Sequence, residues 1–164
     1  MINLIIQFLD SSPRELAVVI LSALPITELR LAVPVAIHTW QLRPLEALGY
    51  ALVGNLIPLV PLYFGLNKLR VISEKYAPWL TQMIDNSVNR AERKVRNKYA
   101  KYGALALFLF TALPLPLTGL WTATLASVAL KIPFKYSAPS IAFGVVIAGV
   151  IVTIITVSTR VAIS

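Results

Sequence analysis

The chain has 164 residues and a net charge of +8, yet only 13% of its residues are charged and 57% are hydrophobic, with a mean hydropathy of +0.76. This composition is typical of a membrane protein and excludes an ordinary water-soluble globule. The sequence contains no cysteine and one histidine, which excludes disulfides, thiolate metal sites and thiol nucleophiles. We therefore predict a protein that is not an enzyme and holds neither metal nor cofactor.

Residues 1–12 precede the first helix signal. They lack the basic leading region and small-residue cleavage site of a secretory signal, so we expect a short interfacial segment that is retained. Ser12 and Glu15 then form a capping box with Pro13 at the first helical position, which predicts that a helix begins there.

Residues 14–42 are apolar but contain Pro25 and Pro34, which bracket Glu28 and Arg30. A continuous helix through both prolines would lose backbone hydrogen bonds where no water replaces them. We interpret this stretch as a re-entrant hairpin. Arms of about 10 to 12 residues reach ~15 to 18 Å, to the bilayer midplane, and return. The tip would carry the two charged residues at that depth.

No residue between Glu46 and Lys68 is charged, a length that exceeds the roughly 20 apolar residues needed to cross a bilayer. The pattern predicts an uninterrupted transmembrane helix over 47–67, which completes a first repeat over 13–67. Asn55 is polar within this span and is expected either to contact a hairpin or to serve helix packing.

The stretch 68–101 holds nine basic residues against three acidic ones, which assigns this amphipathic helical linker to the cytoplasm. Beside a membrane, such charge favours contact with anionic lipid headgroups over binding of nucleic acid, which we do not expect.

The second half repeats the pattern of the first. Residues 102–130 are uncharged but are cut by Pro114 and Pro116, which predicts a second re-entrant hairpin. Residues 137–159 are uncharged and predict a second transmembrane helix, so that 102–164 forms the second repeat.

The two halves also match in sequence, because Ala23-Leu24-Pro25 recurs 89 residues later as Ala112-Leu113-Pro114, and Pro44 recurs as Pro133. With the linker in the cytoplasm, the first hairpin would enter from outside and the second from inside. The predicted fold class is therefore an all-α integral membrane protein, an inverted repeat of a re-entrant hairpin plus a transmembrane helix, joined by a basic cytoplasmic helical linker.

The segments Leu24 to Pro34 and Ala112 to Thr122 together resemble the small multidrug export family, and the resemblance extends from about residue 14 onward. This family is regarded as related to the DedA/VTT membrane proteins, which have paired re-entrant hairpins. The resemblance implies proton-coupled export or, by analogy with DedA, lipid translocation. DedA relatives usually carry a functional arginine in the second hairpin, whereas Arg30 here lies in the first and the second has none.

Glu28 and Arg30 are the predicted proton-coupling residues, because an ionisable group at bilayer depth costs about 2.5 to 3.5 kcal/mol and persists mainly where it has a function. The alternative is a structural ion pair that locks the hairpin. Residues two apart do not face each other on an α-helix, so we expect an extended tip in which they lie on one side.

The substrate is expected to bind near the midplane, where helix ends expose unpaired backbone groups. Glu28 and Arg30 would face the second hairpin there. In the alternative interpretation the threonines only satisfy freed carbonyls and the glycine only permits packing. The predicted substrate-binding residues are Pro25, Pro34, Asn55, Pro114, Pro116, Thr118, Gly119, Trp121 and Thr122.

These features together predict a multi-pass transporter of the cell (plasma or inner) membrane that exports small amphipathic or cationic molecules with proton coupling. Two spans and two hairpins make a thin bundle, so self-association as a homodimer or larger assembly is expected, with membrane lipids as further partners. A lipid flippase acting on phospholipid or polyprenyl phosphate, and a membrane scaffold or insertion factor, are the alternatives.

Overall fold

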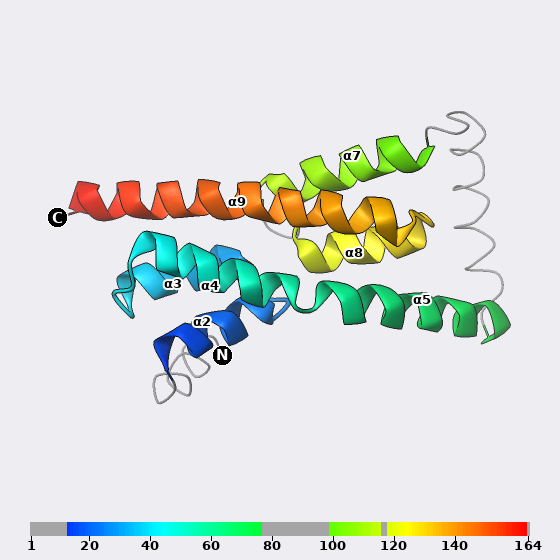
Figure 1. Ribbon diagram of the computed structural model, residues 1–164, viewed down its shortest axis with the longest axis horizontal. Helices are drawn as coiled ribbons and strands as arrows, with labels where there is room; N and C mark the ends of the chain where they lie inside the picture. The colour runs from blue at the N-terminus through cyan, green and yellow to red at the C-terminus, as the bar shows by residue number, and fades with distance from the viewer. Residues whose placement is uncertain (1–12, 77–98, 116–117, 164) are drawn as a thin grey trace. The chain divides into compact units, whose positions relative to one another are not determined.

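The computed structural model describes residues 13–76, 99–115 and 118–163, with side chains placed for 13–69, 101–115 and 118–159 (Figure 1). All regular elements in these ranges are helices, which confirms the predicted all-α class. The expected interfacial segment 1–12, most of the linker and Pro116 lie outside the described residues. The helices are α2 (Arg14–Ala23), α3 (Glu28–His38), α4 (Pro44–Leu56), α5 (Leu59–Tyr76), α7 (Tyr99–Ala112), α8 (Leu120–Ala129) and α9 (Phe134–Ile163).

The chain divides into two compact units. The first unit consists of Met1–Pro58 and Val145–Ser164, and the second of Leu59–Gly144. The first unit therefore contains α2, α3, α4 and the second half of α9, while the second contains α5, α7, α8 and the first half of α9.

In the first unit, α2 and α3 form a helical hairpin that packs on α4. The guanidinium of Arg14 donates a hydrogen bond of 3.1 Å to the carbonyl of Trp40, so the open ends of the two helices are tied together. Small residues on each helix, such as Ala17, Ala32 and Ala51, are fully buried. Such residues let helix backbones approach closely, as in membrane bundles.

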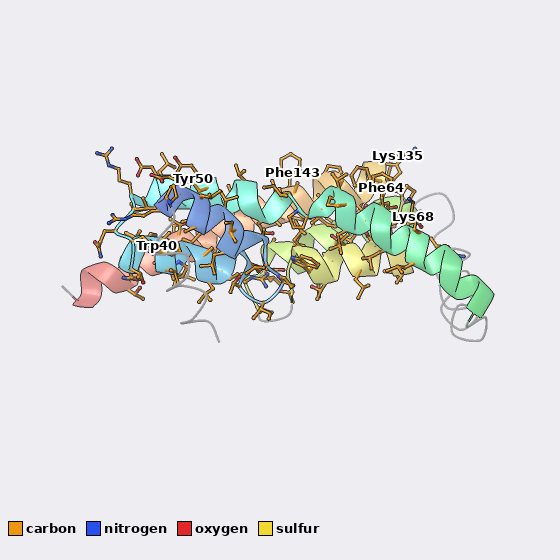
Figure 2. All side chains as sticks on the ribbon, turned by 90° about the horizontal axis from the view of Figure 1, so that it is seen from below. Trp40, Tyr50, Phe64, Lys68, Lys135 and Phe143 are labelled. Carbon is orange, nitrogen blue, oxygen red and sulfur yellow. The ribbon has the colours of Figure 1, made fainter. Side chains whose placement is uncertain are left out.

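In the second unit, the start of α9 is held by aromatic contacts with α5. The rings of Tyr63 and Phe64 lie 5.0 and 5.2 Å from that of Phe134, and the Tyr63 hydroxyl donates a 2.9 Å hydrogen bond to the carbonyl of Ile132. Figure 2 labels Phe64 and also Lys135, which follows Phe134 in the sequence. These contacts fix the turn between α8 and α9.

Each unit contains, within itself, a close helix contact at a glycine. A Cβ at Gly54 would overlap the Val19 carbonyl and the Ser22 hydroxyl, and a Cβ at Gly144 would overlap the Thr111 hydroxyl and lie 2.8 Å from the Phe108 carbonyl. Val19 and Phe108, like Ser22 and Thr111, are separated by the same 89 residues as the repeated Ala-Leu-Pro segments. The partners of the two glycines thus keep the 89-residue spacing, whereas the glycines themselves are 90 residues apart.

Two stretches in the described residues are long and apolar enough to cross a membrane, Pro44–Leu69 and Phe134–Thr159, each of 26 residues. The second contains the predicted helix 137–159 without a break. The first differs from the uninterrupted helix predicted over 47–67, because α4 ends at Leu56 and α5 begins at Leu59. Pro58 and Pro61 lack the N–H groups that would continue the hydrogen-bond ladder across this point.

Pro34 also differs from its predicted role at the hairpin break, because it lies inside α3. The break itself occupies only residues 24–27, directly after α2. Pro139 is likewise accommodated inside α9. A proline inside a helix removes one hydrogen bond and kinks the helix, and neighbouring helices can tolerate this in a membrane.

Candidate functional site

The break between α2 and α3 is compact and satisfies its own backbone. The Thr27 hydroxyl donates to the carbonyl of Leu21, and the amide of Glu28 donates a 3.0 Å hydrogen bond to the carbonyl of Leu24. Pro25 and Ile26 are exposed, the latter at 76%, whereas Thr27 is buried. The break thus presents an apolar tip with a buried polar base.

Glu28 lies at this base, as the first residue of α3. Glu28 is only 8% exposed. Its backbone has a positive φ of 46°, which a non-glycine residue rarely adopts. Such backbone strain costs about 1 to 3 kcal/mol and clusters at ligand-binding and switch positions. The strained conformation holds the carboxylate at the end of the hairpin.

Arg30 is two residues further along the same helix. Its Nη1 lies 3.7 Å from Oε2 of Glu28, so the two form an ion pair. The extended tip predicted for these residues is therefore wrong, because both lie in the first turn of α3. The two side chains meet although they are only two residues apart, at the point where Glu28 has its positive φ.

The ion pair is partly shielded from solvent. The side chains of Arg30 and Glu28 are 19% and 10% exposed. Removing one partner of such a pair leaves an uncompensated buried charge, which is strongly unfavourable. A cation that replaced the guanidinium, or a proton bound by the carboxylate, would restore the balance.

Asn55 is the second unusual polar residue of the first unit. It lies near the end of α4, is 1% exposed, and neither its Oδ1 nor its Nδ2 has a hydrogen-bond partner among the described residues. A buried polar group without a partner costs about 1 to 3 kcal/mol. Such orphaned groups are rare in native proteins and call for a bound water, an ion or a ligand group.

The break between α7 and α8 is stabilised by a side-chain hydroxyl, that of Thr118. The Thr118 hydroxyl lies 2.8 Å from the Leu113 carbonyl and 2.9 Å from that of Leu115, and can donate to either. Pro114, which lies between these two leucines in the sequence, is half-buried. Thr118 therefore bonds to carbonyls around the proline, as the packing interpretation of this segment expected.

The start of α8 is organised in a similar way. The Gly119 amide donates a 3.0 Å hydrogen bond to Oγ1 of Thr122, and the Thr122 hydroxyl lies 3.1 Å from the carbonyl of Gly119. Gly119 is buried, while Trp121 and Thr122 are half-buried. Thr122 thus caps the helix, and a substrate-binding role for this segment stays a prediction.

The structure brings some of the predicted residues together and separates others. Pro25, Glu28 and Arg30 share the first hairpin, and Asn55 belongs to the same unit on α4, whereas Pro34 lies more than one turn into α3. The predicted residues of the second hairpin belong to the second unit. Their expected position opposite Glu28 therefore stays a prediction. The described residues contain no group of three or more His, Asp or Glu side chains that could hold a metal.

Ser22 and Thr111, the hydroxyl residues that face Gly54 and Gly144, were not predicted from the sequence. Both are buried and bond back to their own helices, Ser22 to the Val19 carbonyl at 3.0 Å and Thr111 to that of Leu107 at 2.8 Å. The signal that could have found them is the 89-residue offset, which places a small hydroxyl residue at both positions.

A family model described as "Putative small multi-drug export protein" matches residues 28–151, from the buried glutamate to the second half of α9. No curated protein and no solved structure matches the chain.

Proposed function

Because the chain belongs to the small multi-drug export family, we propose that it is a proton-coupled exporter of small amphipathic or cationic molecules. The family and the two apolar spans make it a membrane protein. The observation that carries the proposal is Glu28, a buried carboxylate held in strained backbone at the base of the break between α2 and α3. A carboxylate in that position suits the reversible binding of a cation or a proton.

In the proposed cycle, a cationic substrate displaces the Arg30 guanidinium from the carboxylate of Glu28. Protonation of the carboxylate from the opposite side of the membrane then releases the substrate. Release of this proton to the cytoplasmic side lets Arg30 pair with Glu28 again, so one proton enters for each positive charge that leaves and the exchange is electroneutral. The 3.7 Å separation of the ion pair supports this step, since a long pair is more readily opened than a short bidentate one.

Asn55 is proposed as a neutral ligand for the substrate. Its amide has both a donor and an acceptor, and each lacks a partner among the described residues. A polar group on the substrate would satisfy them and would contribute specificity, because a substrate without that group would leave the amide unpaired. Thr118, Trp121 and Thr122 are the proposed contacts from the second hairpin.

The proposal includes a multi-pass topology in the cell membrane, with the basic stretch 68–101 in the cytoplasm and at least two copies in the assembly. The concentration of positive charge in that stretch supports the orientation. The inverted arrangement of the two hairpins follows from that orientation together with the repeated sequence.

The direct test is transport by purified protein in liposomes with an imposed pH gradient, with ethidium as the cationic probe. In the wild type, ethidium and protons should cross the membrane in opposite directions. Glu28→Gln should reduce both fluxes at least tenfold. Glu15→Gln is the matched control, since Glu15 is an exposed carboxylate in the first turn of α2. Equal fluxes in the two variants would rule out Glu28 as the coupling residue.

The same liposomes distinguish export from lipid translocation. Lipids labelled in the inner leaflet become accessible to an external quencher only if the protein moves them across the bilayer. A Glu28-dependent loss of label, without ethidium movement, would replace the exporter with a lipid translocase.

A further inference from the structure

A groove runs along the second unit between α7 and the first half of α9. It has a volume of about 480 Å³, within the ~300 to 1,000 Å³ typical of ligand sites. Each helix contributes a stripe of residues spaced four and three apart, which is one face of a helix. The stripes are Lys101, Leu105 and Phe108 on α7, and Tyr136, Ser140 and Phe143 on α9.

The two helices run parallel along the groove. A Cβ at Gly103 would lie 2.7 Å from Cδ1 of Ile132, and further along, one at Gly144 would lie 2.8 Å from the carbonyl of Phe108. Lys101 and Tyr136 therefore share one end of the groove, and Phe108 and Phe143 share the other. Seven helical residues separate the two ends, a rise of ~10 Å.

The polar end of the groove is cationic. Lys101 lines this end, and the ammonium of Lys135 lies 5.0 Å from the centre of the ring of Tyr136, which also lines it. No aspartate or glutamate occurs in the sequence after Glu92, so neither of the helices that line the groove contains an acidic residue. The groove thus combines a positive end with a polar middle, at Ser140, and an apolar end.

The apolar end is open to its surroundings. Leu105 and Phe143, which is labelled in Figure 2, are 53% and 67% exposed. Both belong to apolar segments, and α9 is one of the two candidate membrane spans. A soluble anion would use the lysines but would leave the aromatic and aliphatic lining without a partner. A molecule with a negative head and an acyl chain matches both ends.

We propose that this groove binds one anionic phospholipid, with its phosphate beside Lys101 and Tyr136 and an acyl chain along Leu105, Phe108 and Phe143. Lysine supplies the positive charge that attracts an anionic headgroup near a membrane surface. The site lies within the second unit and does not use Glu28, so it stands whether or not the first hairpin exports a substrate.

The test is native mass spectrometry of the full chain released from detergent, titrated with phosphatidylglycerol or phosphatidylcholine. The wild type should retain one phosphatidylglycerol at least fivefold more strongly than phosphatidylcholine. Lys101→Gln should abolish this preference, whereas Lys68→Gln, a change at an exposed lysine outside the groove, should keep it. Equal retention of both lipids by the wild type would overturn the proposal.

A second pair of variants tests the acyl-chain end and does not depend on charge. Leu105 and Leu109 lie on the same helix and are both 53% exposed, but only Leu105 lines the groove. Leu105→Ala should weaken phosphatidylglycerol retention at least threefold and Leu109→Ala should not. If the two variants behave alike, or if glycerol phosphate competes as well as the whole lipid, the groove is not a phospholipid site.

Discussion

Gly54 and Gly144 lie where any side chain would meet a neighbouring helix. Gly54→Ala places a methyl group against the Val19 carbonyl, and backbone cannot move aside as a flexible side chain can. We expect the free energy of unfolding to fall by about 1 to 3 kcal/mol, the usual cost of overpacking. Chemical denaturation in detergent micelles measures this change.

Gly49 provides the control for that substitution. It lies one and a half turns before Gly54 on α4, and a Cβ there would have nothing within 4 Å. Gly49→Ala should therefore stabilise the protein by about 0.5 to 1 kcal/mol, because alanine restricts the unfolded chain. Equal effects of the two substitutions would mean that α2 and α4 are not in close contact at Gly54.

Asn55 allows stability and function to be separated at one residue. Asn55→Ala removes a buried amide that has no partner among the described residues, and relief of its cost of about 1 to 3 kcal/mol should offset the cavity left by the smaller side chain, so the unfolding free energy should change by less than about 1 kcal/mol. Transport of ethidium should nevertheless fall at least tenfold if the amide binds substrate. Asn67→Ala, a change at an exposed residue of α5, should alter neither. A large loss of stability with normal transport per folded molecule would assign Asn55 to packing.

At the scale of single elements, the break between α7 and α8 depends on a side-chain hydroxyl. Thr118→Val removes a donor to the carbonyls of Leu113 and Leu115, and should cost about 1 kcal/mol of unfolding free energy. Thr153→Val is the control, because the Thr153 hydroxyl donates to Gly149 within a continuous helix. Chemical denaturation of both variants should show a smaller loss for Thr153→Val, and the reverse order would contradict this role.

The prolines show how far the elements could be predicted from sequence. Pro25 and Pro114 were predicted to end helices, and each lies in the break that follows one, α2 or α7. Pro34 was assigned to a break but lies inside α3, and Pro58 was passed over although α4 ends just before it. The outcome depends on whether neighbouring helices can accommodate a kink and a freed carbonyl. That is a property of packing, which one sequence does not contain.

The candidate site was predicted in part for a related reason. A charged pair inside an apolar stretch marks Glu28 and Arg30 in any reading of the sequence. The positive φ that joins them in one helical turn could not be predicted, because left-handed backbone at a glutamate is imposed by its surroundings. The groove beside Lys101 and Tyr136 was also missed, since it is formed by residues from two helices that are distant in sequence.

At the scale of the whole molecule, the proposed orientation can be tested by labelling single introduced cysteines, because the natural sequence contains none. Single cysteines introduced by Gln41→Cys and Lys68→Cys would lie near opposite ends of the span Pro44–Leu69, at exposed positions. In right-side-out vesicles an impermeant maleimide should label only Gln41→Cys, and in inverted vesicles only Lys68→Cys. Lys101→Cys should follow Lys68→Cys. Labelling of Gln41→Cys and Lys68→Cys from the same side would exclude a crossing between them.

The division of the chain into units has a consequence for biosynthesis. The second unit is continuous from Leu59 to Gly144, whereas the first is completed by residues that follow it, with Gly149 beside Leu48 and Leu52. Chains emerge from the ribosome N-terminus first, and units fold as they are completed. The hairpin that carries Glu28 is thus made first but gains its full set of neighbours only after Val145 has been translated. In a nascent chain stalled before that point, Leu48 and Leu52 would lack their contact with Gly149. Such an incomplete unit would be a substrate for membrane proteases.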